Sequence, residues 1–134
     1  MAGTVVADTL QADSTSTLVL KNGVANTPPT IQDSAGTQIG TFCRAFCNFN
    51  GTGTVAIRAS FNVTSITDNG TGDYTVNFTT AMPDANYSFV ATSGGGGWVT
   101  RIASMAAGNC NIQTIVGNTT TATDTTFVNA SIFR

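Results

Sequence analysis

The sequence contains no histidine and no glutamate, and its only lysine is Lys21. Without histidine, no serine or cysteine has the usual base that activates it as a nucleophile, and the common imidazole ligand for zinc is missing. The seven aspartates are left for acid–base work, and most lie in turn sequences, where aspartate bonds its own backbone. We therefore expect no catalytic residue, no cofactor and no metal site, and we predict that the protein is not an enzyme. The minor alternative is a Ca²⁺ ion held by Asp68, Asp73 and nearby carbonyls.

Charge is scarce as well: charged residues make up 9% of the chain, and the formal net charge is −2. The five cations are scattered, whereas nucleic-acid binding requires a basic patch. No segment approaches the ~20 apolar residues of a membrane span. We therefore expect neither nucleic-acid binding nor membrane insertion. So few charges are unusual on a free monomer, and we predict an obligate oligomer whose subunits cover much of each other's surface.

Cysteine is limited to Cys43, Cys47 and Cys110. Cys43 and Cys47 share one face of a predicted strand, but they are roughly 13 Å apart along it and cannot bond each other. A bond from one of them to Cys110 remains an alternative. The odd count favours buried free thiols.

The chain is rich in Thr, Val, Asn, Ser and Gly, which favour strands and turns over helices. The clearest pattern runs from Cys43 to Ser93, where apolar and polar residues alternate as in half-buried strands. Asn- and Gly-rich turns at 50–53 and 68–73, and a break at 82–86, divide it into four predicted strands. The second strand is predicted to have one apolar side, formed by Val55, Ile57, Ala59, Phe61 and Val63.

The segment from Thr41 to Asn50 carries apolar side chains on both of its faces, which predicts burial by the core on one side and by a neighbouring subunit on the other. Arg44 and Arg58 lie among apolar residues. A buried arginine needs a carboxylate or carbonyl partner. The candidate carboxylates are Asp68, Asp73 and Asp84.

The same central segment, CRAFCNFNGTGTVAIRASFNVTSITDNGTGDYTVNFTTAMPDANYSFVATS, resembles a segment that recurs in virion-surface and tail-fibre proteins of tailed bacteriophages, notably those of marine bacteria and cyanobacteria. The resemblance covers the middle third of the chain closely and the last third loosely. It implies a phage structural protein, usually trimeric, without catalytic residues. It does not indicate where on the particle the protein lies.

The last third adds three predicted strands, at 98–105, 110–116 and 125–133. About eight short strands with turns every 8–12 residues are typical of a β-sandwich. The predicted fold is therefore an all-β, antiparallel, jelly-roll-like sandwich spanning 41–134, forming a homotrimer. The strand order is not readable from one sequence.

Residues 1–40 are predicted to form an extended N-terminal arm for attachment or trimerisation, as in the phage fibres that the chain resembles. The arm has two short apolar runs, two prolines that exclude a central strand, and an Asp/Gly turn between Ile31 and Ile39. The alternative is a flexible arm followed by an edge hairpin. The candidate attachment residues are Val5, Val6, Leu10, Leu18, Leu20, Pro28, Pro29 and Ile31.

Two loops are candidates for contact with a partner or receptor: a glycine-rich loop beside Trp98 and a threonine-rich loop at 117–124. An exposed Trp98 would stack on a sugar or a partner. The competing interpretation places Trp98 in the core, where a lone tryptophan of a small sandwich usually packs. The candidate contact residues are Gly94, Gly95, Gly96, Gly97, Trp98, Thr119, Thr120 and Thr121.

Two hypotheses for function follow. In the first, the protein is a trimeric fibre or knob on the virion surface that contacts host glycans. In the second, it is a decoration or cement protein that stabilises the phage head. Both predict self-association, binding to other virion proteins and assembly in the cytoplasm of the bacterial host.

Overall fold

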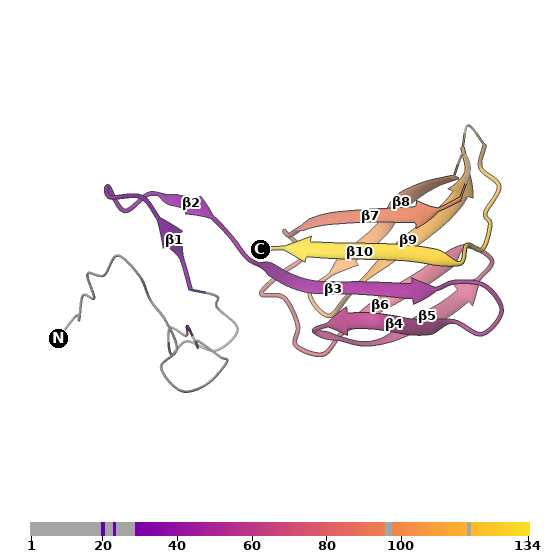
Figure 1. The fold of residues 1–134 in the computed structure, drawn as a ribbon, viewed down its shortest axis with the longest axis horizontal. Coiled ribbons are helices and arrows are strands. Elements are labelled where there is room, and N and C mark those ends of the chain that lie inside the picture. The colour runs from indigo at the N-terminus through magenta and orange to yellow at the C-terminus, as the bar shows by residue number, and fades with distance from the viewer. Residues whose placement is uncertain (1–19, 21–22, 24–28, 96–97, 118) are drawn as a thin grey trace.

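The computed structural model describes residues 20, 23, 29–95, 98–117 and 119–134. Two four-stranded antiparallel sheets face each other in the part that it describes (Figure 1). The first sheet has the order β4 (Ala56–Phe61), β3 (Cys43–Asn50), β10 (Phe127–Phe133), β7 (Ser88–Gly94). The second has the order β5 (Val63–Gly70), β6 (Asp73–Phe78), β9 (Asn109–Val116), β8 (Trp98–Ala106). The predicted antiparallel β-sandwich of eight strands is confirmed.

The core lies between the sheets and follows the period-two alternation of the inner strands. Along β6, Tyr74, Val76 and Phe78 are buried, and the residues between them face outward. Aromatic rings meet edge to face across the core: the ring centroids of Phe49 and Tyr74 are 5.2 Å apart. The core cluster consists of Ala45, Cys47, Phe49, Val63, Tyr74, Val76, Phe78, Met82, Tyr87, Phe89, Cys110, Ile112, Val128, Ala130 and Ile132.

The cysteines are free thiols, as expected: Cys47 and Cys110 are buried, and Cys43 is half-buried. Burial raises the pKa of Cys47 and of Cys110 to about 12. Burial likewise raises the pKa of Tyr87, whose hydroxyl shares its proton between the carbonyls of Ala106 and Asn109, to about 12. All three groups therefore stay protonated in the folded state far above their ordinary pKa values.

These raised pKa values predict that stability falls in alkali. An unfolded thiol ionises near pH 8.5 and an unfolded tyrosine near about pH 10. Above about pH 8.5 the unfolded chain releases protons that the folded chain retains, so the free energy of unfolding declines until about pH 12 and is unaffected by these groups below that range. Urea unfolding measured across this range should show the decline, and Cys110→Ala should make its slope shallower. A free energy of unfolding that stays constant to about pH 11 would contradict this expectation.

One strand prediction is wrong: the run from Val55 to Val63 forms two strands in different sheets. Asn62, between β4 and β5, has a φ of 56° and turns the chain from the first sheet into the second. Its side chain holds this corner: Nδ2 donates to the carbonyls of Arg44 and Thr80, and Oδ1 accepts from the Thr80 backbone N–H at 2.7 Å. Short polar side chains such as asparagine tolerate this left-handed conformation best.

A β-bulge in β4 changes which of its residues face the core. Ile57 lies opposite the buried Phe49, but Ala59 lies opposite Asn48 and Phe61 opposite Phe46. From Ile57 to Ala59, β4 advances two residues while β3 advances one, so the alternation in β4 shifts phase at Arg58. Phe61, predicted to share one apolar side with Ile57 and Val63, therefore faces outward and is 56% exposed.

The corner predicts a specific cost for Asn62→Ala. This variant loses three hydrogen bonds and leaves a Cβ-bearing residue at positive φ, so we expect the free energy of unfolding to fall by about 2–4 kcal/mol. Asn62→Gly is the matched variant, because it loses the same hydrogen bonds but relieves the backbone, and it should cost less. Urea titrations of both variants test this account, and equal losses would contradict the contribution from φ.

The described part of the arm is a small hairpin, β1 (Ile31–Gln32) with β2 (Gln38–Gly40), which stands apart from the sandwich (Figure 1). Its turn is the predicted one: the Asp33 carboxylate accepts from the backbone N–H groups of Ala35 and Thr37, and Gly36 has a φ of 82°. Of the predicted attachment residues, Leu20 and Ile31 are exposed and Pro29 is half-buried. The others, namely Val5, Val6, Leu10, Leu18 and Pro28, lie outside the described residues.

Candidate functional site

The strongest candidate site is the outer face of the β4-β3-β10-β7 sheet, called here the outer face. One cross-strand row on it contains Phe61, Phe46, Ser131 and Val90, which are paired in register from β4 to β7. Phe61 and Val90 are more than half exposed, and Phe46 is 39% exposed. The rings of Phe46 and Phe61 stack with centroids 6.4 Å apart. This apolar row therefore presents a stripe of hydrocarbon to solvent.

The next row consists of amide and hydroxyl groups that bond to one another across the strands. It contains Ala59, Asn48, Asn129 and Thr92 in register. Asn48 Nδ2 donates to Asn129 Oδ1 at 2.6 Å, and Asn129 Nδ2 donates to Thr92 Oγ1 at 3.4 Å. Because these side chains are held by their neighbours, little side-chain entropy remains to be lost when a partner covers them.

A third row lies toward the loops and is built around Phe127, which is 52% exposed. The Arg58 guanidinium carbon sits 4.6 Å from the centroid of the Phe127 ring, a cation–π contact. The sequence predicted a carboxylate or carbonyl partner for Arg58, whereas the structure places the Phe127 ring beside it. The ring also packs over Gly94: a Cβ at that position would come within 2.9 Å of the Phe127 Cβ.

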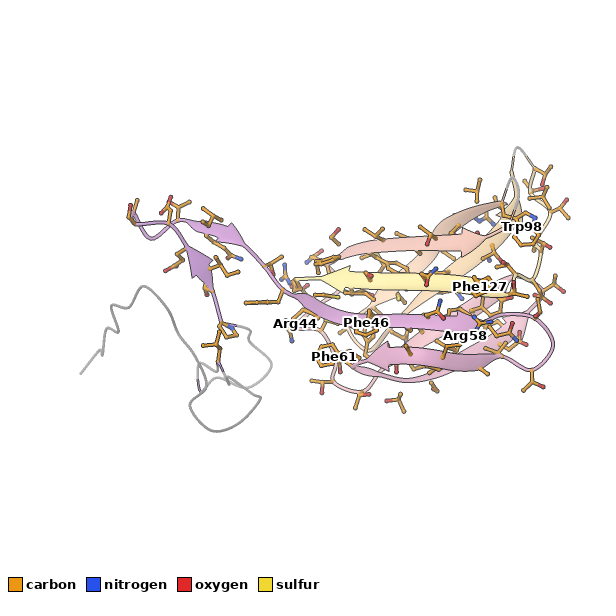
Figure 2. The ribbon with its side chains drawn as sticks, viewed as in Figure 1. Arg44, Phe46, Arg58, Phe61, Trp98 and Phe127 are labelled. Atoms are coloured by element: carbon orange, nitrogen blue, oxygen red, sulfur yellow. The ribbon has the colours of Figure 1, made fainter. Side chains whose placement is uncertain are left out.

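Charge on this sheet is of one sign. Its four strands contain Arg44 and Arg58 and no aspartate. Figure 2 places Arg44 with Phe46 and Phe61 toward the arm, and Arg58 with Phe127 toward the opposite end. A hollow of about 310 Å³, lined by Arg44, Phe61, Asn62, Thr79 and Thr80, extends the face at the arm end. The outer face is therefore apolar, amide-rich and cationic.

The opposite face of the sandwich, on the β5-β6-β9-β8 sheet, carries a network of polar side chains that bond to one another, beside the exposed Val99. The Asp73 carboxylate accepts from Asn69, Asn111 and Gln113, and Gln113 accepts from Arg101. Desolvation acts to raise the pKa of Asp73, but these hydrogen bonds and the charge of Arg101 outweigh it and lower the pKa. Both carboxylate oxygens are thus engaged with side-chain amides, not directed at an ion.

The predicted contact loops meet at the end of the sandwich away from the arm (Figure 1). The Tyr74 hydroxyl oxygen lies 2.7 Å from the Gly51 carbonyl oxygen and 2.9 Å from Asp124 Oδ1, which share its one proton. Asp124 Oδ1 also accepts from the Gly72 N–H. Thr125 Oγ1 adds a hydrogen bond to the Gly94 carbonyl. Burial, followed by this contact with Asp124, raises the pKa of Tyr74. The four loops at this end are therefore tied together.

The structure describes most of the predicted contact residues. Trp98 is half-buried and packs over Gly95, so it is neither a member of the core cluster nor a freely exposed ring. Thr119, Thr120 and Thr121 are exposed, and Gly94 is half-buried at the end of β7. Gly96 and Gly97 lie outside the described residues.

The alternation in the sequence does not mark Phe61, Val90 and Phe127 as exposed residues of one face. Only one signal pointed to this face, namely the apolar residues on both sides of 41–50, which include Phe46. The other residues of this face are determined by the phase shift at Arg58 and by the pairing of β10 with β3 on one side and β7 on the other.

Within the described residues, no group of three or more candidate metal ligands occurs, and no helix is long and apolar enough to cross a membrane. The geometry shows one face with a self-bonded polar network beside the exposed Val99, and one apolar, cationic face. Comparisons of the chain with protein-family profiles, with curated proteins and with solved structures find no match.

Proposed function

We propose that the protein is a non-enzymatic structural protein of a bacteriophage virion, a trimeric knob or short fibre whose subunits associate through the outer face. The resemblance of residues 43–93 to phage surface proteins supports the virion assignment. The observation that carries the assembly role is the apolar row on the outer face, where Phe46, Phe61 and Val90 are exposed in one cross-strand line.

The composition of this face fits burial by protein. Isolated exposed apolar residues are ordinary, but neighbouring ones in a row mark interaction sites. Aromatic residues and arginine are enriched at the cores of protein interfaces, whereas lysine and acidic residues are depleted there. Phe46, Phe61, Phe127 and Arg58 match that composition on a sheet without any acid.

In this proposal the two ends of the sandwich have different roles, attachment at one end and receptor contact at the other. The arm leaves from one end and attaches the trimer to the particle. The loops at the far end, with Trp98 and the exposed Thr119–Thr121 segment, face outward and contact host-surface glycan. Rigid loops suit this task because the Tyr74 and Asp124 hydrogen bonds hold them before a ligand arrives.

A capsid decoration protein is the second candidate, and the arm hairpin favours it. The β1–β2 hairpin stands away from the sandwich and exposes Ile31 and Ile39, at 41% and 65%. A projecting apolar hairpin is suited to gripping a neighbouring virion protein. In this alternative the loops have no receptor.

Immunogold electron microscopy of intact particles tests the location, and a glycan array probed with the purified full chain tests the receptor. The knob proposal expects label on the tail and binding to host polysaccharide. Label on the head without glycan binding would establish the decoration alternative. Absence of the protein from particles would overturn both.

A further inference from the structure

We infer that the β1–β2 hairpin of one copy docks in the hollow at the arm end of a neighbouring copy's outer face, with Ile39 against Phe61 and Asp33 toward Arg44. This inference rests on the self-association in the proposed function. It adds a second contact between copies and names its two halves, a projecting hairpin and the hollow that receives it.

The hairpin is too small to be stabilised by its own packing. Its strands are two and three residues long, and its two isoleucines, Ile31 and Ile39, are 41% and 65% exposed. An isolated two-stranded hairpin is marginally stable at best in water and needs a further surface to pack on. Because the hairpin stands apart from its own sandwich (Figure 1), that surface comes from another molecule.

Charge complementarity favours the hollow of a second copy as that surface. Asp33 is the only charged residue in the sequence from Pro29 to Gly40. Arg44 is the only charged residue among the five that line the hollow, and the sheet that bears it contains Arg44 and Arg58 and no aspartate. An acidic hairpin therefore meets a cationic hollow, whereas hairpin against hairpin or hollow against hollow would bring like charges together.

The turn of the hairpin fixes the Asp33 carboxylate in position for this contact. Oδ1 accepts from the backbone N–H groups of Ala35 and Thr37, each at 2.9 Å. Because both of these bonds go to Oδ1, Oδ2 can accept from a partner, and the residue is exposed. Guanidinium and carboxylate groups form some of the strongest hydrogen bonds in proteins. A side chain that is already held loses little further entropy when it docks.

The hollow also has an apolar wall. Phe61 is 56% exposed and lines a volume of about 310 Å³ together with Arg44 and polar side chains. Its ring stacks on Phe46, so the hollow continues the apolar row of the outer face. Ile39 has the largest exposed fraction of the large apolar side chains that the structure describes. Packing Ile39 against Phe61 removes apolar surface of both residues from water.

Removing the charge of Asp33 while keeping its turn tests the inference. Asp33→Asn retains an Oδ1 acceptor for Ala35 and Thr37 but loses the negative charge, so self-association of the full-length chain should weaken about five- to tenfold in sedimentation equilibrium. Asp68→Asn is the matched control, since Asp68 is exposed on the other sheet and its Oδ1 likewise accepts a turn N–H, from Gly70. The control should leave association unchanged, and equal effects of the two variants would overturn the inference.

Disulfide trapping identifies which molecule supplies the hollow. Ile39→Cys and Thr80→Cys are made in separate full-length chains, each with Cys43→Ser, so that the remaining natural thiols, Cys47 and Cys110, are buried. Mixing the two chains under oxidising conditions should give a covalent dimer, because Thr80 lines the hollow that receives Ile39. Either variant alone should give little dimer.

The outcomes separate the possible occupants. Val99→Cys, on the opposite face, replaces Thr80→Cys in the control mixture, and a covalent dimer in both mixtures would overturn the inference. A chain with both Ile39→Cys and Thr80→Cys that closes a bond within itself, while the mixture gives no dimer, would show that the hairpin covers its own hollow and would also overturn it.

Two further results distinguish this inference from the proposed function. Absence of any cross-link while the oligomer persists overturns the inference and leaves the self-association standing. An unmodified chain that is a single copy at every concentration overturns both. Circular dichroism and thermal melting of each variant exclude unfolding as the cause.

Discussion

Replacing Phe46 and Phe61 together by aspartate should convert the oligomer into folded single chains. Both rings point away from the core and stack on each other at a centroid distance of 6.4 Å. Burying a phenylalanine side chain contributes about 1.5–3 kcal/mol, so losing both, and burying two carboxylates in their place, should weaken association by roughly a thousandfold or more. The fold should survive, because neither ring belongs to the core cluster.

Val99→Asp on the opposite face is the matched control for this double variant. Val99 is 48% exposed on β8, beside the polar network, and has no role in the proposed interface. Light scattering coupled to size exclusion should give the mass of one chain for the double variant and of the oligomer for the control. An oligomer that persists in the double variant would show that copies meet elsewhere.

The second large effect is expected at Gly72, in the β5–β6 turn. Gly72 has a φ of 65°, and a Cβ there would lie 2.5 Å from the Thr114 carbonyl oxygen and 2.7 Å from the Thr123 nitrogen. These two backbone atoms bond to each other, because Thr123 N donates to Thr114 O, while Thr114 N holds the turn by donating to Gly72 O. Gly72→Ala should therefore lower the free energy of unfolding by about 3–5 kcal/mol, from φ strain and overpacking together.

Gly53→Ala separates the two contributions. Gly53 has nearly the same φ, 62°, but no atom lies within 4 Å of its hypothetical Cβ. It should cost about 1–2 kcal/mol, from φ strain alone. Urea unfolding of both variants measures the difference. Equal losses would mean that the loop end yields easily and is not the rigid assembly that the hydrogen bonds of Tyr74 and Asp124 indicate.

Much of the sandwich could be predicted from sequence because its inner strands alternate without interruption. In Asp73–Phe78 the buried and outward residues follow the pattern residue by residue. The Asn- and Gly-rich turns were also predictable, since their backbone demands positive φ at Gly70 and Gly72. The strand prediction was wrong at β4, because the alternation in the sequence continues through both the bulge at Arg58 and the corner at Asn62. A period-two pattern cannot reveal an inserted residue, because a bulge is defined by the partner strand.

The candidate site was less predictable for the same reason. A cross-strand row such as Phe61–Phe46–Ser131–Val90 brings together residues from four strands, and its composition depends on strand order and register. In the sequence, Phe61 resembles a core residue and Val90 a minor member of an alternating strand. The loops around Trp98 are recognisable in the sequence because they contain a glycine run and the lone tryptophan, whereas a row of residues from four strands has no such linear signature.

The most direct test of this account is the molar mass of the unmodified full-length chain in solution, measured by sedimentation equilibrium from nanomolar to micromolar concentration. The account predicts a mass about three times that of one chain across the micromolar range, with the outer face buried. A mass of one chain throughout that range would contradict it.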